Sequence, residues 1–325
     1  MSFTFRPATR ENVGLLIGLA GSTGAGKTFT AMRLATGLSG DKPFAVIDTE
    51  AGRAKHYADR FKFDHGDLKP PFTPAAYAEA IAAADAAHYP VIVVDSMSHE
   101  HAGEGGLLEW HEAELQRMAG DDWKRRDSCT MAAWIKPKAA HKTMVSRLLQ
   151  IRAHLILCFR AEEKIEMARD AEGKMKIIPK RTRTGKDGWV PICEKNLPFE
   201  MTCSFLLTDD APGFPKPIKL QEQHRHLFPL DKPIDEETGR GLAAWAAGGK
   251  SIIGTPLSEG LADDLKYRLK CAAQCGKKEL RATWDKLSAI ETRIAASYKD
   301  ELKRQAEESD RKRQAEESDR AVDAP

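Results

Sequence analysis

The clearest chemistry in the sequence is carried by a glycine-rich segment of eight residues, which reads Gly21-Ser22-Thr23-Gly24-Ala25-Gly26-Lys27-Thr28. Its glycines let the backbone curl so that successive N–H groups point at phosphate oxygens. Lys27 is spaced to reach the β- and γ-phosphates of a nucleotide, and the Thr28 hydroxyl is spaced to bind Mg²⁺. The segment therefore predicts a site for ATP and Mg²⁺ that includes every residue from Gly21 to Thr28.

Two carboxylates follow apolar runs that are typical of buried strands, and each is placed to act on such a nucleotide. Asp95 ends the run 91–94, where a carboxylate at the carboxyl end of a strand faces the loop and holds Mg²⁺ through water. Glu50 lies just past the run 44–48, placed to polarise the water that attacks the γ-phosphate. Kinases need no such base, so Glu50 favours hydrolysis. Asp48, on the same face of its strand, is a competing candidate.

Basic residues adjoin tryptophans at two places in the middle of the chain. The first group is Lys124, Arg125 and Arg126 beside Trp123, and the second is Lys136, Lys138 and Lys142 near Trp134. Such groups suit single-stranded DNA, because the cations contact phosphates and the aromatic rings stack on bases. The alternative is a solvated helix face with a tryptophan in the core.

The elements that must position these residues alternate between short β-rich runs and helical patterns from Gly14 to about Leu207, which predicts an α/β domain whose mainly parallel sheet lies between helices. Strands are expected at 15–20, 44–48, 91–94 and 155–159, with edge strands at 205–207 and 218–220. Helices are expected from Thr28 onward and at 74–88, 107–118 and 138–152. Alternating apolar residues on either side of 170–173 predict a projecting β-hairpin.

The later part of the chain predicts a separate helical region. The expected segments are a core at 1–247, a linker rich in glycine and small residues at 248–256, a helical appendage at 257–302 and a charged tail at 303–325. The tail contains the nine residues KRQAEESDR twice in succession. Favourable charge pairs at i,i+4 and the lack of an apolar stripe predict either a solvated helix or a disordered tail.

Three segments together resemble the bacterial recombinase RecA and its core-ATPase relatives: AVIDTE at 45–50 and VIVVDS at 91–96, behind GSTGAGKT. Within that superfamily, the compact length and the helical tail are most similar to phage-encoded RecA-like ATPases of the single-strand annealing (Sak) type, which are AAA-family nucleotide-binding proteins. The resemblance covers about residues 12–210. RecA's helical N-terminal oligomerisation segment is not found, which argues against filaments of the RecA kind.

The resemblance implies a nucleotide site at a subunit interface, Glu50 as the activating base, and DNA-binding loops after the strands that end at Asp95 and Phe159. Where RecA has a sensing glutamine after the later strand, this chain has Arg160, which is expected to sense the γ-phosphate or to contact DNA. Arg181 and Arg183 are similar to the Lys-x-Arg-x-Gly element that hexameric RecA-like motors insert into a neighbour's site. A DNA phosphate contact and a solvated basic loop remain the alternatives for this pair.

Composition sets wider limits on function. A net charge of +2 gives no global attraction to nucleic acid, so any such binding depends on local patches. Scattered cysteines in apolar runs and the lack of a membrane-spanning stretch favour a soluble, cytoplasmic protein.

The predicted function is an oligomeric ATPase that acts with single-stranded DNA in phage recombination or replication. The alternatives are a hexameric helicase or packaging motor, and a non-catalytic switch that recruits partners through the C-terminal helices. A single-strand-binding or recombination protein is the expected partner of those helices.

Overall fold

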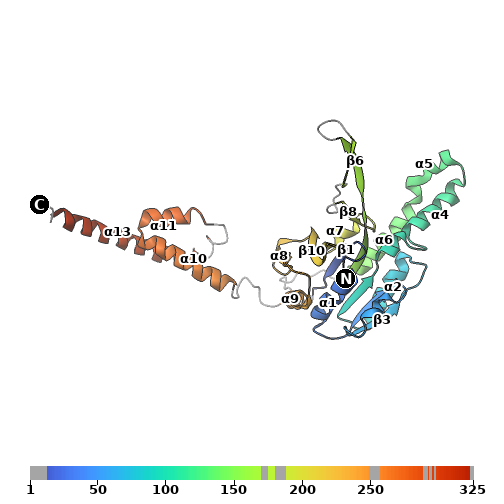
Figure 1. Ribbon diagram of the computed structural model, residues 1–325, viewed down its shortest axis with the longest axis horizontal. Helices are drawn as coiled ribbons and strands as arrows, with labels where there is room; N and C mark the ends of the chain where they lie inside the picture. The colour runs from blue at the N-terminus through green and yellow to red at the C-terminus, as the bar shows by residue number, and fades with distance from the viewer. Residues whose placement is uncertain are drawn as a thin grey trace, which may run out of the picture. The chain divides into compact units, whose positions relative to one another are not determined.

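The computed structural model describes residues 13–169, 175–179, 188–248, 257–287, 292, 295 and 298–322. The chain divides into two compact units, residues 1–248 and 249–325 (Figure 1). The first unit is the α/β domain expected from the sequence, with a mostly parallel sheet between helices.

The sheet of the first unit has the strand order β10-β9-β1-β5-β4-β2-β3, and β8 pairs with the extension of β5. Its strands are β1 (Leu16–Gly21), β2 (Phe44–Asp48), β3 (Phe63–Asp67), β4 (Val91–Asp95), β5 (His154–Glu163), β8 (Trp189–Pro191), β9 (Cys203–Thr208) and β10 (Ala211–Lys219). All neighbours from β9 to β3 are parallel, whereas β10 and β8 are antiparallel to their partners. The residues of β1, β2, β4 and β9 are buried throughout, as expected for strands covered on both faces.

Alternate residues along the strands enter two separate hydrophobic cores. Ile17 and Leu19 of β1 pack with α1 (Lys27–Ser39) and α9 (Glu236–Ala246) on one face. Leu16 and Ala20 of the same strand pack on the other face with α2 (Pro74–Ala86) and α6 (Ile135–Leu148). Thr73 caps the N-terminus of α2, because its hydroxyl accepts a hydrogen bond from the Ala76 N–H at 3.2 Å.

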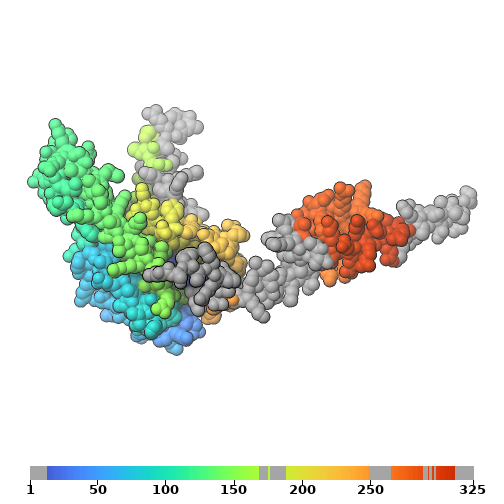
Figure 2. Space-filling model, turned by 180° about the vertical axis from the view of Figure 1, so that it is seen from behind, coloured from blue at the N-terminus to red at the C-terminus, as the bar shows by residue number. Residues whose placement is uncertain are grey.

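Helices α3 (Ser98–Ala102), α4 (Leu107–Ala119) and α5 (Trp123–Ala133) follow β4. Helices α4 and α5 form a hairpin, here called the arm, which stands out from the first unit in both views (Figures 1 and 2). The sequence did not predict α5, because its apolar residues lack a helical stripe. The helix expected at 138–152 begins earlier, at Ile135, and ends at Leu148, since Pro137 in its first turn is compatible with a helix start.

Other elements refine the sequence-based expectations. The hairpin is present as β6 (Ile165–Arg169) paired with β7 (Met175–Pro179). The expectation that 205–207 forms an edge strand is wrong, because β9 lies between β1 and β10. The edge strand β3 was missed, since its sequence FDHGD lacks an apolar run. The short elements η1 (Arg53–Tyr57), α7 (Leu197–Glu200) and α8 (Glu222–Arg225) complete this unit.

The second unit consists of α10 (Leu257–Gln274), α11 (Lys277–Trp284) and α13 (Lys299–Val322) around a small apolar core. The tail is helical, and the first copy of its repeat contributes Ala306 to this core. Asp310 of that copy also accepts a hydrogen bond from the Lys277 N–H at 3.1 Å. Of the predicted linker at 248–256, all residues after Gly248 lie outside the described residues. None of the helices in the described ranges is long and apolar enough to cross a membrane.

Close packing of α1 on α9 fixes the helix that follows the glycine-rich loop. A Cβ atom on Gly37 would lie 2.0 Å from the Glu236 backbone oxygen, and one on Gly239 would lie 2.4 Å from that of Leu34. Arg33 of α1 also donates to both carboxylate oxygens of Glu236 at 2.6 to 3.0 Å. Two glycines and one ion pair therefore set the position of α1.

Substitution of Gly37 by alanine is expected to lower the free energy of unfolding of the first unit by about 3 kcal/mol, because the backbone of α9 must move. Gly241→Ala is the matched control: its Cβ would lie an ordinary 3.5 Å from Leu227, and alanine favours a helix. Denaturant unfolding of both variants measures the difference. Equal stabilities would show that the helix contact is looser than described.

Candidate functional site

The loop from Gly21 to Gly26 joins β1 to the N-terminus of α1. Gly24 and Gly26 have φ angles of 86° and 77°, a region that favours glycine. A Cβ on Gly21 would lie 2.4 Å from the Leu207 oxygen of β9. Three of the loop's glycines are thus required by its shape, and the backbone N–H groups that open α1 form an anion-binding end of the helix.

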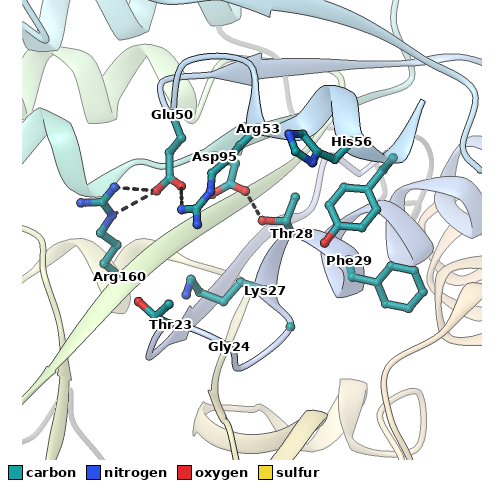
Figure 3. Close-up of a pocket in the computed structure, with 12 residues that line it drawn as sticks. Thr23, Gly24, Lys27, Thr28, Phe29, Glu50, Arg53, His56, Asp95 and Arg160 are labelled. Atoms are coloured by element: carbon teal, nitrogen blue, oxygen red, sulfur yellow. Dashed lines mark hydrogen bonds and ion pairs between the residues drawn. The ribbon is translucent and has the colours of Figure 1, made fainter. Parts of the chain in front are cut away.

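Lys27 crosses the mouth of this loop. Its Nζ donates hydrogen bonds to the backbone oxygens of Gly21 at 3.0 Å and Ser22 at 2.7 Å. Burial lowers the pKa of Lys27, while nearby carboxylates, Asp95 and Glu50 among them, oppose that shift. The ammonium group lies at the end of the cavity where a triphosphate would approach it (Figure 3).

Asp95 ends β4 directly opposite the start of α1. Its Oδ2 accepts a hydrogen bond of 2.5 Å from the Thr28 hydroxyl. Burial is the main reason why the pKa of Asp95 is raised to about 6, against a usual value of 3.8, and the Thr28 hydrogen bond only partly offsets it. A hydroxyl and a carboxylate in contact are the oxygen ligands that Mg²⁺ prefers, so both residues fit the predicted metal site.

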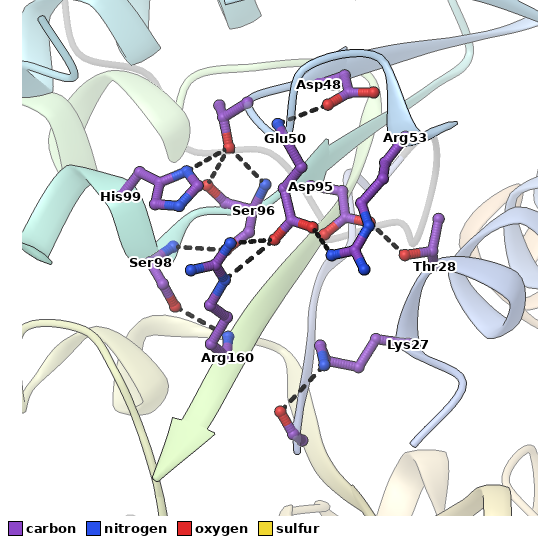
Figure 4. Close-up of polar contacts among 12 residues, drawn as sticks. Lys27, Thr28, Asp48, Glu50, Arg53, Asp95, Ser96, Ser98, His99 and Arg160 are labelled. Atoms are coloured by element: carbon purple, nitrogen blue, oxygen red, sulfur yellow. Dashed lines mark hydrogen bonds and ion pairs between the residues drawn. The ribbon is translucent and has the colours of Figure 1, made fainter. Parts of the chain in front are cut away.

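Glu50 follows β2 and is held by two guanidinium groups. Its Oε1 accepts hydrogen bonds from Nε and Nη2 of Arg160 at 3.0 and 2.8 Å. Its Oε2 accepts one from Nη1 of Arg53 at 2.7 Å. Burial would raise the pKa of Glu50, but the hydrogen bonds from Arg53 and Arg160 outweigh it, so this pKa lies below its usual value. Glu50 is therefore ionised and faces the same cavity as Lys27 (Figure 4).

Asp48, the competing candidate for the base, has a different position. It is 1% exposed, and its two oxygens accept hydrogen bonds from the N–H groups of Glu50 at 2.6 Å and Ala54 at 2.9 Å. Its Oδ2 also lies 3.2 Å from Nε2 of His65. Asp48 thus shapes the turn that carries Glu50 and does not face the cavity.

These groups line one cavity of about 640 Å³ (Figure 3). Its lining residues are Thr23, Gly24, Gly26, Lys27, Thr28, Phe29, Glu50, Arg53, His56, Tyr57, Asp95 and Arg160. The rings of Phe29 and Tyr57 lie 5.9 Å apart beside the loop and give the cavity an aromatic wall. Such a wall suits a nucleotide base.

Sequence reasoning missed Arg53, His56 and Tyr57, which belong to the short helix η1. Their position follows from the turn at Ala51 and Gly52, both of which have positive φ angles. The pair His56-Tyr57, six and seven residues after Glu50, was the signal in the sequence.

The basic residues beside Trp123 and Trp134 lie on α5 and α6 and do not line the cavity, whereas Arg160, the other expected DNA contact, does. Arg126 donates hydrogen bonds to Gln116 Oε1 at 2.6 Å and to the Gly120 oxygen at 3.2 Å, and it also pairs with Glu112. Arg126 therefore holds the arm together, whereas Lys124 and Arg125 are exposed. Arg181 and Arg183 lie outside the described residues.

Comparison with known families agrees with this geometry. A family profile described as an AAA domain matches residues 14–187. The chain belongs to this AAA domain family. The matched range contains the glycine-rich loop, Glu50, Asp95 and Arg160, and the AAA domain assigns the first unit to the P-loop ATPases with a mostly parallel sheet. No curated protein matches the chain.

Replacement of Asp95 by asparagine is expected to stabilise the nucleotide-free AAA domain at pH 7.5. An acid whose pKa is raised in the folded state is most stable below its unfolded pKa, near 4, and loses that stability as the pH rises to about 6. The shift from 3.8 to about 6 corresponds to about 3 kcal/mol, which the neutral amide avoids.

The measurement is urea unfolding of wild type and Asp95→Asn between pH 3.5 and 8, with the exposed Asp59→Asn as control. The two curves should converge near pH 3.5, separate between about pH 4 and pH 6, and stay apart by a constant amount above that range. A less stable Asp95→Asn protein at pH 7.5 would contradict the described environment of Asp95.

Proposed function

We propose that the first unit binds ATP with Mg²⁺ and hydrolyses it. The observation that supports this most strongly is the position of Glu50. It lies on the same cavity as the glycine-rich loop, Thr28 and Asp95, at the end of the strand next to β4. A carboxylate in that place can accept the proton of a water that attacks the γ-phosphate.

The other residues supply binding and charge. The N–H groups at the start of α1 and the Lys27 ammonium hold the phosphates, which requires Lys27 to exchange its two backbone oxygens for phosphate oxygens. Thr28 and Asp95 would hold Mg²⁺, which would supply positive charge against the phosphates. Arg160 holds Glu50 in place from β5.

Lys27→Ala and Glu50→Gln are expected to separate binding from hydrolysis. Lys27→Ala should abolish Mg²⁺-dependent phosphate release and weaken ATP binding, because the charge on the β- and γ-phosphates loses its partner. Glu50→Gln should keep ATP affinity within about threefold but lower turnover at least about 100-fold, in the range typical of general-base loss. Phosphate release and calorimetric ATP binding measure the two effects. Unchanged turnover in Glu50→Gln would show that Glu50 is not the base, whereas a wild type that binds ATP without turnover would favour the recruitment switch.

We further propose that single-stranded DNA is the partner and that the protein acts in phage recombination or replication, as its resemblance to Sak-type ATPases implies. Exposed side chains of α5 and α6 support this proposal. Trp123 at the start of α5 is 72% exposed, and Lys124 of α5 and Lys138 and Lys142 of α6 are exposed. Aromatic and basic groups together fit the bases and phosphates of a single strand.

The corresponding prediction is that single-stranded DNA stimulates ATP turnover and that Lys138→Glu with Lys142→Glu removes the stimulation. Loss of two phosphate contacts should also reduce the salt dependence of DNA binding. Lys62→Glu with Lys69→Glu, near β3, carries the same charge change and serves as the control. Fluorescence anisotropy at several salt concentrations gives the slope. Equal DNA binding by both double variants would rule out α6 as the DNA contact, and turnover indifferent to every DNA would rule out the recombination role.

We also propose that the protein self-associates into a ring or filament. In this assembly Arg183 would enter the nucleotide site of a neighbouring subunit. Mixtures of Arg183→Ala and Lys27→Ala subunits test the shared site, because complementary halves would restore turnover. Unwinding of duplex DNA would instead favour the hexameric motor.

A further inference from the structure

In the described arrangement Glu50 is a weak base. Its side chain is 13% exposed, and its two oxygens already accept three N–H hydrogen bonds from Arg160 and Arg53. Both cations lower the pKa of Glu50 against the effect of burial. Three of the four or so lone-pair sites of this carboxylate are thus in use, and release of one arginine would strengthen Glu50 as an acceptor of a proton from water.

Arg160 is the arginine that is fixed. It lies within β5, where its N–H donates to the Ser98 hydroxyl at 2.9 Å and its backbone oxygen accepts from the Ile192 N–H at 2.8 Å. Its guanidinium makes two hydrogen bonds to the same oxygen of Glu50. Moving Arg160 would break both and leave the partly buried Glu50 without its main partner.

Arg53 is the arginine that can move. It is the first residue of the five-residue helix η1, directly after Gly52, which has a φ angle of 84°. Its side chain is 68% exposed and makes one hydrogen bond to Glu50. An ion pair that is this exposed contributes little to stability, so its loss costs little.

The position of Arg53 puts the nucleotide phosphates within its reach. Arg53 lines the cavity together with Gly24, Lys27 and Thr28 of the loop, and its guanidinium lies between Glu50 and Thr28 (Figure 4). The γ-phosphate carries more negative charge than one carboxylate and presents oxygens for bidentate contacts.

We propose that Arg53 is a catalytic residue supplied by the same subunit, which exchanges Glu50 for the γ-phosphate when ATP binds. This inference rests on the proposed ATPase function. Glu50 Oε2, now open, accepts a proton from water while the water oxygen bonds to the γ-phosphorus. The bond from that phosphorus to the bridging oxygen breaks, and its electron pair stays on the β-phosphate of ADP. Arg53 offsets the charge that develops on the γ-phosphate oxygens.

The exchange also makes the availability of Glu50 as a base depend on bound ATP. ADP lacks the γ-phosphate, so Arg53 stays on Glu50 and the site remains inactive. The cation required for turnover then comes from the subunit that binds the nucleotide, in contrast to the neighbour-supplied Arg183.

The test compares Arg53→Ala and Arg53→Lys with the matched control Lys55→Ala, an exposed residue of the same short helix that does not line the cavity. Arg53→Ala should lower kcat at least about 100-fold, in the range of lost electrostatic stabilisation, with ADP affinity within about threefold of wild type. Arg53→Lys should recover part of the loss, and Lys55→Ala should match wild type. Thermal melting within about 2 °C of wild type would show that the fold is intact.

Mixing decides which subunit supplies the cation. Arg53→Ala mixed with Lys27→Ala should show no turnover above the sum of the two alone, because a cis residue and Lys27 must share one subunit. Recovery of turnover in that mixture would overturn the cis assignment, and so would a kcat of Arg53→Ala within threefold of wild type. Wild type in the same assay distinguishes failure of the Arg53 inference from failure of the proposed ATPase function. If wild type and Arg53→Ala both hydrolyse ATP at similar rates, only the inference fails. An inactive wild type overturns the ATPase function and the inference together.

Discussion

The parallel pairing of β1, β5, β4 and β2 is the constraint on which the site depends. Parallel strands end on the same edge of a sheet, so the residues that follow them are brought together whatever their distance along the chain. Gly21 of β1 pairs with Arg160 of β5, and Asp48 of β2 pairs with Asp95 of β4. A shift of any one strand by a single residue would reverse which face its side chains occupy. Alternate residues of β1 are buried in two different hydrophobic cores, and this packing prevents such a shift.

This arrangement gathers charges at a cost to the fold. Three cations, Lys27, Arg53 and Arg160, surround the carboxylates of Glu50 and Asp95 in one cavity. Glu50 is stabilised as an anion by its arginines, whereas Asp95 has a hydroxyl partner and a raised pKa. The surroundings of these two carboxylates, at neighbouring strand ends, thus shift their pKa values in opposite directions. That difference assigns them different tasks, because a group that is costly to ionise gains most from a metal ion nearby.

The sequence predicted the parts of the site that depend on local chemistry. The glycine-rich loop and the continuous apolar strands before Glu50 and Asp95 are short-range signals, and the structure has them where expected. Features set by tertiary contacts could not be predicted in this way. The aromatic wall of the cavity depends on the position of η1, which carries Tyr57. The hydrogen bonds between Arg160 and Glu50 join residues 110 positions apart in the chain. Helix α5 was missed because it has no apolar stripe. Polar contacts hold it against α4, such as the hydrogen bond from Arg126 to Gln116.

Helix α3, which follows the end of β4, is held to α6 by a buried carboxylate. Glu100 lies five residues after Asp95, is fully buried, and accepts a hydrogen bond of 2.9 Å from Nδ1 of His141 on α6. The other nitrogen of His141 faces Glu194 at 4.0 Å, in the segment after β8. Since an unpaired buried carboxylate is costly, these three elements must keep their relative positions or move together. Glu100 and His141 therefore hold α3, α6 and the segment after β8 together just beyond the end of β4, where Asp95 meets Thr28.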